Sequence, residues 1–564
     1  MRRQIRRTAV VLAGILGAGL LAPISPAFAA DPITTFRASL EGAQSGYRGY
    51  DVFVRVLGEW RRGEPATINT TTDEVTVASR TYTGAEQFAF FPADGGTLPS
   101  AVHKNISYKA CDISGNTFKI NSTSISGCVG NFKDFTDVGT GQQYVSLPTT
   151  GPTWYVRDLV LPTGVTLKGV YRGGNLATPD SLGRYVGSGA LEILLHVEPT
   201  APLTEQTIQA TAISSGSPDR ILTMPFHAKQ LTPLTLTPAT YFPAINGQPT
   251  WQSVMLSKGD ELCPINPSTG KRDPGTQAIT SESQVWYYDG AWVYRQIADW
   301  TGDPSWDDCA DSISAQYNAQ VSGTGAPQAW RVFTDGLRSS GYIATVKKMA
   351  DNGLFSNTGG GSFDYYVRET TFILETAINA AESHGYDSPA AIPTTDPSWV
   401  RIKRNIEWTT TKLLGWLDGY RNDNYTYQQS FMTGLALNAL RRYWEFSGDP
   451  RIPVETAAAM NHIWDVMWVP AVPAETLINN PAPLGARCEW GCAPEGGTML
   501  INLVAANFAW LYSITNQNGF FWKGNDMFRR SFAATPWSGK EFSQNFRFSF
   551  DFVKYRLGQP PYRP

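Results

Sequence analysis

Hydrophobic and polar residues alternate in the first half of the chain and recur with a helical period in the second. Short alternating runs such as Tyr50–Val56 and Leu191–Val197, bounded by turn-forming residues, are typical of β-strands. From about residue 280 onward, the apolar residues follow long helical periods instead. The sequence therefore predicts a multidomain chain, with a sandwich-like all-β region at 31–235, a linker at 236–275 and a helical domain at 276–564.

The helical domain is predicted to consist of repeated helical hairpins. Three segments resemble one another, namely Trp286–Asp303, Phe431–Asp449 and Leu500–Thr515. The first two end in Gly-Asp-Pro, where the glycine caps a helix and the proline follows it. Further helices are expected at 305–320, 340–350, 364–384, 398–418, 452–468 and 541–556. Hairpins repeated at such a period indicate a solenoid or a closed ring.

The β-region contains a stretch with its own order of motifs. Glu74–Val77 is followed by Gly95–Pro99 (GGTLP), Ser114–Ile120 (SGNTFKI) and the turn Val138–Gly141. This order resembles a small β-module of phage tail proteins and other bacterial surface proteins. The resemblance implies a β-module at about 66–148 with a structural or spacing role and no catalytic residues.

The N-terminus has the features of a secretory signal peptide at residues 1–30. Four arginines between Arg2 and Arg7 precede the apolar run Thr8–Leu21, and Ala27–Ala29 forms a small-x-small cleavage site. A membrane anchor is the alternative, but a span needs about 20 apolar residues and prolines interrupt this run. We therefore expect a secreted or periplasmic protein without a membrane span.

The six cysteines fit an oxidising compartment. Six cysteines allow 15 pairings, so the pairing is inferred only from proximity along the chain. On that basis we expect disulfides between Cys111 and Cys128, between Cys263 and Cys309, and between Cys488 and Cys492.

Composition narrows the class of partner. Subtracting the four signal-peptide arginines changes the formal charge from −3 to −7, which does not favour nucleic acid or anionic membranes. The chain has 18 Trp and 24 Tyr, whose rings stack on sugar faces while their polar edges stay in water. A large core also uses aromatic residues. We predict a polysaccharide or oligosaccharide partner, whereas the oligomeric state stays open.

The helical pattern resembles the (α/α) toroid of six-hairpin glycosidases and related polysaccharide lyases. The resemblance is carried by Tyr288–Ala291 (YDGA), Tyr427–Leu435 (YQQSFMTGL) and the two Gly-Asp-Pro stops. It implies a fold in which an all-β region is followed by an all-α toroid of helical hairpins. It also implies that substrate binds at the mouth where the inner helices begin.

Three carboxylates are candidates for acid and base chemistry at this mouth. Asp289 lies among aromatic residues, where a raised pKa suits a general acid, although a helix-dipole role is the alternative. Glu369 follows a glycine run and two tyrosines, or forms a surface pair with Arg368. Asp423 lies in a loop of alternating polar and aromatic residues, which suits a sugar site or a capping turn. We predict that these three carboxylates share acid, base and positioning roles, without assigning which is which.

Aromatic residues and one arginine are expected to contact the substrate. Trp490 stands within the short Cys488–Cys492 ring, which is otherwise a stapled surface loop. No metal or cofactor is expected, although Asn422–Asn424 could contribute to a calcium site. The predicted substrate-binding residues are Trp286, Tyr288, Tyr365, Tyr366, Arg368, Tyr427 and Trp490.

Three functions stay open at this point. The first is a secreted glycoside hydrolase that degrades a polysaccharide. The second is a polysaccharide lyase with Tyr365 or Tyr366 as the base and Arg368 as the group that neutralises a uronate. The third is a non-catalytic glycan-binding surface protein. The chain has no Gly-x-Ser-x-Gly elbow, no His-Glu-x-x-His zinc motif and no P-loop, so the corresponding enzyme classes are disfavoured.

Overall fold

The computed structural model describes most of the chain after residue 32. It leaves out 83–86, 94–95, 103–107, 123–131, 174, 188, 276–288, 323–333, 353–366, 422–429, 470–475, 478–500, 532–539, 562 and 564. The chain divides into two compact units. The larger unit comprises Thr35–Arg61, Ser122–Ser126 and Pro148–Pro564, and the smaller comprises Met1–Thr34, Arg62–Asn121 and Gly127–Leu147. In the part that the structure describes, no helix is long and apolar enough to cross a membrane.

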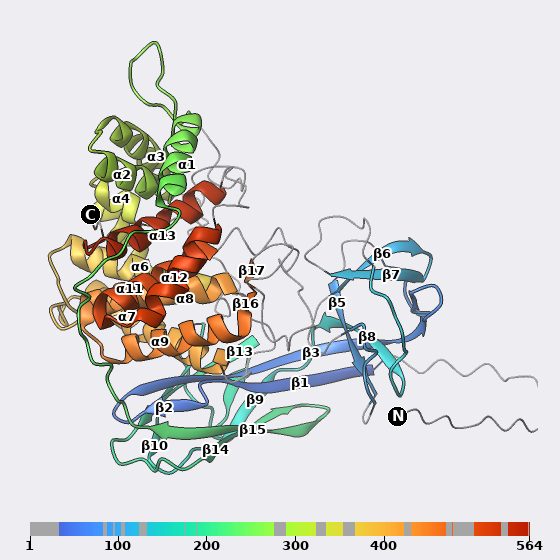
Figure 1. The fold of residues 1–564 in the computed structure, drawn as a ribbon. Coiled ribbons are helices and arrows are strands. Elements are labelled where there is room, and N and C mark those ends of the chain that lie inside the picture. Colours follow the sequence, from blue (N-terminus) through green and yellow to red (C-terminus); the bar gives the residue numbers. More distant parts are fainter. Residues whose placement is uncertain are drawn as a thin grey trace, which may run out of the picture. The chain divides into compact units, whose positions relative to one another are not determined.

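Strands dominate residues 33–229, and helices follow from residue 248 (Figure 1). This confirms the predicted order of an all-β region and a helical region. The strands of the β-region are β1 (Ile33–Gly42), β2 (Ser45–Tyr47), β3 (Asp51–Asn69), β4 (Glu74–Thr76), β5 (Gln87–Pro92), β6 (Tyr108–Ser114), β7 (Thr117–Ser122), β8 (Gln143–Thr149), β9 (Trp154–Val160), β10 (Val165–Arg172), β11 (Asn175–Leu176), β12 (Tyr185–Gly187), β13 (Gly189–Val197), β14 (Gln206–Ser214) and β15 (Ser217–Lys229).

The smaller unit has its own apolar core between antiparallel strands. Val75 of β4 lies opposite Phe118 of β7, and both are fully buried. The β6–β7 turn contains Gly115, whose positive φ of 63° favours glycine. Most of the stretch 66–148 lies in this unit, except 122–126 and residue 148. That this stretch is a phage-tail-like β-module stays a prediction.

The β-strands of the larger unit form a sandwich. One sheet has the order β12-β9-β14-β15-β2, and the other includes β11-β10-β13-β3. Trp154 of β9 is buried in the sandwich core, where its indole lies against Gly58 and Gly187. A Cβ atom on Gly187 would lie 2.2 Å from the Trp154 ring, so glycine is required there for close approach.

The described residues of the helical region contain twelve α-helices. They are α1 (Gln248–Leu262), α2 (Gly290–Thr301), α3 (Ser305–Ser322), α4 (Asp335–Ser339), α5 (Ile343–Asn352), α6 (Val367–Ser383), α7 (Pro397–Arg421), α8 (Ser430–Ser447), α9 (Arg451–His462), α11 (Ile501–Thr515), α12 (Asn518–Ser531) and α13 (Lys540–Arg556). Gly302 and Gly448 follow α2 and α8 with φ values of 68° and 70°. These left-handed glycines confirm the predicted Gly-Asp-Pro stops.

The helices form a closed ring. The inner helices α2, α4, α6, α8, α11 and α13 each contact the next, and α13 contacts α2 again. The remaining six helices pack outside this circle, with α3 on α2, α7 on α6, α12 on α11 and α1 on α13. Because an outer helix returns the chain after each inner helix, the inner helices begin at the same end of the ring.

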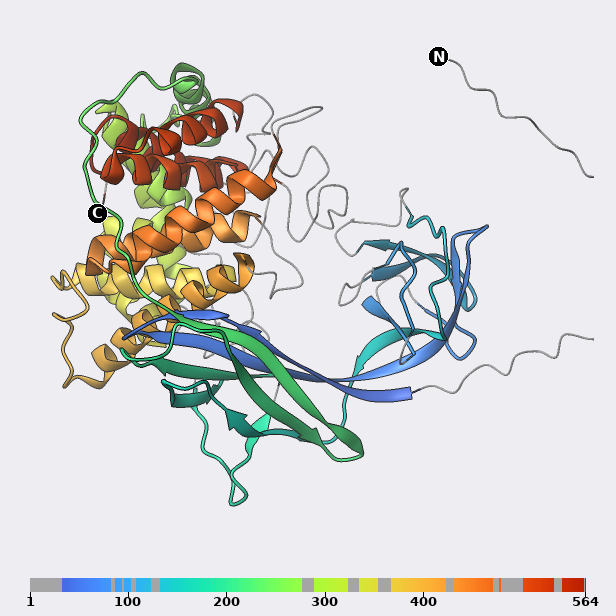
Figure 2. The same cartoon turned by 60° about the horizontal axis from the view of Figure 1, so that its bottom comes forward.

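The residues between β15 and α1 are held against the ring. The N–H of Ala239 donates to the Ser513 carbonyl (2.9 Å), and the Tyr512 hydroxyl donates to the Tyr241 carbonyl. Arg556 donates to the Pro243 carbonyl at 2.9 Å. Figure 2 shows this segment running beside the helices towards α1. Residues 239–243 of the expected linker are thus held to the helical ring by hydrogen bonds. The later part of the expected linker contains α1.

One predicted disulfide is confirmed. Cys263, just after α1, bonds to Cys309 of α3, and both are fully buried. Cys111 is also disulfide-bonded, but its expected partner Cys128 lies outside the described residues, as do Cys488 and Cys492.

Within the larger unit, the sandwich contacts the ring through buried ionic groups on α7 and α9. Asp418 of α7 accepts hydrogen bonds from the backbone N–H groups of Gln44 (2.7 Å) and Ser45 (2.9 Å), and from the Ser45 hydroxyl (2.6 Å). Lys229 of β15 pairs with Glu455 of α9 at 2.8 Å. These contacts fix β2 and β15 against the ring.

Replacing Asp418 by Ala is expected to lower the free energy of unfolding by about 3–5 kcal/mol, because it leaves buried donors unpaired. Urea titration at neutral pH measures this change. The matched control is Glu407→Ala, since Glu407 is an exposed carboxylate on the same helix. A loss below about 1 kcal/mol for Asp418→Ala would mean that water replaces the carboxylate at little cost.

Candidate active site

The candidate site is the end of the ring where the inner helices begin. The segments that precede α2, α4, α6, α8, α11 and α13 lie outside the described residues. Among the predicted site residues, the structure therefore describes Asp289, Arg368 and Glu369. The others lie outside it, namely Trp286, Tyr288, Tyr365, Tyr366, Asp423, Tyr427 and Trp490, together with the Asn422–Asn424 loop.

Asp289 is the N-cap of α2 and is fully buried. Its side chain accepts from the N–H of Trp292 at 3.0 Å and from the N–H of Gly336 at 3.1 Å. The backbone at Asp289 has a φ of 63°, which aspartate tolerates better than most residues. A Cβ atom at Gly336 would lie 2.4 Å from Asp289 Oδ1, so this glycine lets α4 approach the carboxylate. Asp289 thus joins α2 to α4 as well as capping its own helix.

Glu369 lies in the first turn of α6 and is 1% exposed. Its Oε1 accepts from Nε of Arg368 at 2.8 Å and from Nη2 of Arg368 at 2.7 Å. Its Oε2 is buried and accepts no hydrogen bond from any described residue. Buried carboxylate oxygens are normally hydrogen-bonded, so this oxygen is the kind of group that a substrate or water can engage.

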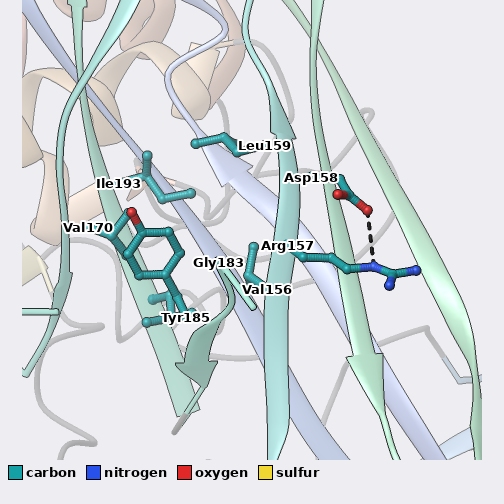
Figure 3. A pocket seen from close by; sticks show the side chains of 9 residues that line it. Val156, Arg157, Asp158, Leu159, Val170, Gly183, Tyr185 and Ile193 are labelled. Carbon is teal, nitrogen blue, oxygen red and sulfur yellow. Dashed lines mark ion pairs between the residues drawn. The ribbon is translucent and has the colours of Figure 1, made fainter. Parts of the chain in front are cut away.

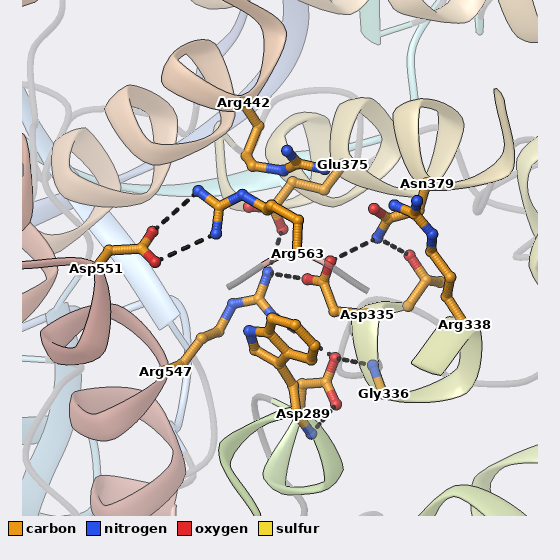
Figure 4. Close-up of polar contacts among 12 residues, drawn as sticks. Asp289, Asp335, Gly336, Arg338, Glu375, Asn379, Arg442, Arg547, Asp551 and Arg563 are labelled. Carbon is orange, nitrogen blue, oxygen red and sulfur yellow. Dashed lines mark hydrogen bonds and ion pairs between the residues drawn. The ribbon is translucent and has the colours of Figure 1, made fainter. Parts of the chain in front are cut away.

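Three carboxylates surround one guanidinium inside the ring, and we call this group the Arg547 cluster. Arg547 of α13 lies 2.7 Å from Asp335 of α4, 3.2 Å from Glu375 of α6 and 3.4 Å from Asp289 (Figure 4). Asn379 of α6 donates to Asp335 at 3.1 Å. The four ionic residues come from four inner helices or their caps, so the cluster fixes the interior of the ring.

The electrostatics of the Arg547 cluster favour protons on two of its carboxyls. Burial raises the pKa of Asp289 to about 7, against the opposite effect of Arg547. Burial likewise raises the pKa of Glu375 to about 7. Burial also raises the pKa of Asp335, but Arg547 and Arg442 outweigh it, so that pKa lies below its ordinary value. At neutral pH the cluster can therefore hold and release a proton.

These pKa shifts predict an unusual pH dependence for Glu375. A carboxyl whose folded pKa is raised binds protons more tightly when folded, so its contribution to stability falls as pH rises from about 4.5 to about 7. The variant Glu375→Gln lacks this loss. We expect its unfolding free energy, relative to the wild type, to increase by up to about 1.4 kcal/mol per pH unit in this window. Urea titrations at several pH values measure the difference, and a flat difference would contradict the raised pKa.

A second ionic network lies beside the first. Asp551 of α13 pairs with Arg441 of α8 and, at 3.2 Å, with Arg563. Arg563 also contacts Glu445 at 3.1 Å, and Arg442 bridges Glu445 and Glu382. Figure 4 shows that Asp551 and Arg563 lie next to the Arg547 cluster. The two networks together connect α4, α6, α8 and α13 through ion pairs.

Sequence reasoning missed Asp335, Glu375 and Arg547. A signal was present in α13, where Arg547, Asp551 and Tyr555 recur at four-residue spacing among phenylalanines. Charged residues on the same face as a tyrosine in an otherwise aromatic helix indicate a buried polar face. No local signal identifies Asp335, because its role depends on contacts from other helices.

Comparison with known proteins adds little. No protein-family model matches the sequence, and no curated protein matches it. Among solved structures, a Bacteroides ovatus GH5 xyloglucanase in complex with a XXXG heptasaccharide aligns with 72% of this chain and 85% of that chain. The aligned residues are 11% identical, and the TM-score is 0.11. A similarity of this size supports no statement about fold or function.

Proposed function

We propose that the chain is an exported glycoside hydrolase that cleaves a polysaccharide at the end of the ring where the inner helices begin. One observation carries this proposal. Two buried carboxylates, Asp289 and Glu369, stand at the starts of two inner helices of one closed ring, in different electrostatic environments. Glycoside hydrolysis needs such a pair, because one group donates a proton and the other acts as a base or nucleophile.

The environments suggest how the two roles divide. A pKa of about 7 leaves Asp289 partly protonated at neutral pH, which suits the acid that protonates the glycosidic oxygen as the C–O bond breaks. Glu369 is ion-paired through Oε1, while Oε2 has no partner among the described residues. We assign Oε2 the role of accepting the proton from the attacking water. Asp289 has no exposed surface, so substrate binding must uncover it for this role.

Asp423 keeps a positioning role in this proposal, and the predicted aromatic residues stack on the sugar faces. The Cys263–Cys309 disulfide is consistent with export into an oxidising compartment. The excess of Trp and Tyr in the chain supports a carbohydrate substrate over other polymers.

Product analysis on a panel of neutral and uronate-containing glycans tests the proposal. Reducing ends and the ultraviolet absorbance of unsaturated uronides are followed together. We expect reducing ends without a rise in absorbance, and the anomer formed then distinguishes inversion from retention. A rise in absorbance would assign the chain to the lyases and give Tyr365, Tyr366 and Arg368 the central roles. Binding without any product would leave a glycan-binding protein.

A further inference from the structure

The sandwich of the larger unit contains a cavity that the proposed function does not use. The cavity has a volume of about 160 Å³ and lies between the two sheets. Strands β9 and β12 of one sheet and β10 and β13 of the other contribute its lining (Figure 3). It is therefore a gap within the sandwich core and is separate from the ring.

The buried part of the lining is aliphatic, whereas the lining residues Arg157 and Asp158 are exposed. Val156, Val170, Leu191 and Ile193 are at most 3% exposed, and Leu159 is half-buried. An empty apolar cavity destabilises a protein in proportion to its volume, because its walls lose dispersion contacts. Engineered apolar cavities of about 150 Å³ stay dry and accept benzene. The size and lining thus match one six-membered ring.

Tyr185 of β12 adds one polar group to this lining. A phenol hydroxyl can donate or accept one hydrogen bond. A single hydroxyl in an aliphatic site can orient a ligand that carries one hydrogen-bonding group.

The charges near the cavity are already compensated. Arg157 pairs with Asp158 at 3.0 Å and with Asp219 at 2.6 Å. Figure 3 shows that the side chains of Arg157 and Asp158 extend away from Leu159, Ile193 and Tyr185. A charged ligand would therefore lose its hydration without gaining a counter-ion, so the site favours a neutral molecule.

We propose that this cavity is a binding site for a small neutral aromatic molecule with one hydroxyl or carbonyl group, which hydrogen-bonds to Tyr185. The ring fills the space between Val156, Val170 and Ile193. The site is independent of the carboxylates in the helical ring.

Titration of the full chain with phenol, benzene and benzoate, followed by calorimetry and ligand-observed NMR, tests the proposal. We expect saturable binding of phenol, affinity for benzene that is lower by about fivefold to tenfold, and no binding of benzoate. Tyr185→Phe should remove the preference for phenol over benzene. Failure of phenol to bind saturably would overturn the proposal.

Cavity-filling variants locate the binding. Val156→Phe places a ring in the cavity and should abolish phenol binding, while Ile221→Phe adds the same group at a residue that is 64% exposed and should not. If Val156→Phe does not fold, Val170→Leu fills part of the same space and should weaken binding. Unchanged affinity in the folded cavity variants would place the phenol elsewhere and overturn the proposal. Glycan cleavage should be the same in all of these variants.

Discussion

Replacing Glu369 by Gln is expected to lower glycan turnover by about 100- to 10,000-fold, the usual contribution of a general acid or base. The amide has the shape of the carboxylate but cannot accept a proton from water. Its oxygen can keep the contact with Arg368 that Oε1 makes, so the fold should tolerate the change. Steady-state kinetics on the glycan found in the product analysis measure the loss in kcat.

Glu407→Gln is the matched control, because Glu407 is an exposed carboxylate on the outer helix α7.

Asp289→Asn would not separate a loss of catalysis from a loss of stability as well as Glu369→Gln does. In Asp289→Asn, the side-chain NH2 group would replace Oδ2 and face the N–H of Gly336. Two hydrogen-bond donors would then oppose each other, so stability should fall together with activity. Turnover of Glu369→Gln within about threefold of the wild type would exclude Glu369 as the base.

Helical periodicity predicted most of the ring. The expected helices at 305–320, 398–418 and 541–556 correspond to α3, α7 and α13, with ends that differ by at most three residues. Periodic apolar positions identify such helices because each buries one face. The order of the β-region and the helical region followed from the same kind of pattern.

Three helices were not predicted, for different reasons. Helix α1 begins after Gly247 within a Pro- and Thr-rich stretch and buries only Trp251, Met255 and Gly259, so its apolar face is narrow. Helix α4 has five residues, which is too short for a period to show. Helix α12 has an apolar stripe, but glycines at 519 and 524 lower the helix propensity of this segment.

The candidate site was less predictable than the fold. Asp289 was identified from its aromatic neighbours, yet its partners Gly336 and Arg547 lie 47 and 258 residues away in the sequence. Periodicity shows which face of a helix is buried but not which helices meet across a ring. For the same reason, nothing in the sequence around Glu375 indicates that it contacts Arg547 of α13.

Replacing Arg547 by Met is expected to lower the free energy of unfolding at pH 8 by about 3–5 kcal/mol. Arg547 is the cation among Asp289, Asp335 and Glu375, and all four side chains are buried. Without it, three carboxyls face one another in a medium of low dielectric constant. Urea titration measures the loss. Arg547→Lys is the control, because it keeps a positive charge and should recover part of the stability.

The same variant should be more stable in mild acid than in base. Without Arg547, the pKa of each of the three carboxyls is expected to rise, since the cation lowers all three. A raised folded pKa contributes stability below the unfolded pKa of about 4, and that stability is lost as pH rises through the folded value. The deficit of Arg547→Met should therefore shrink when pH falls from 8 to 5. A deficit that is constant across this range would show that Arg547 stabilises the ring by packing, and that the three carboxyls do not depend on its charge.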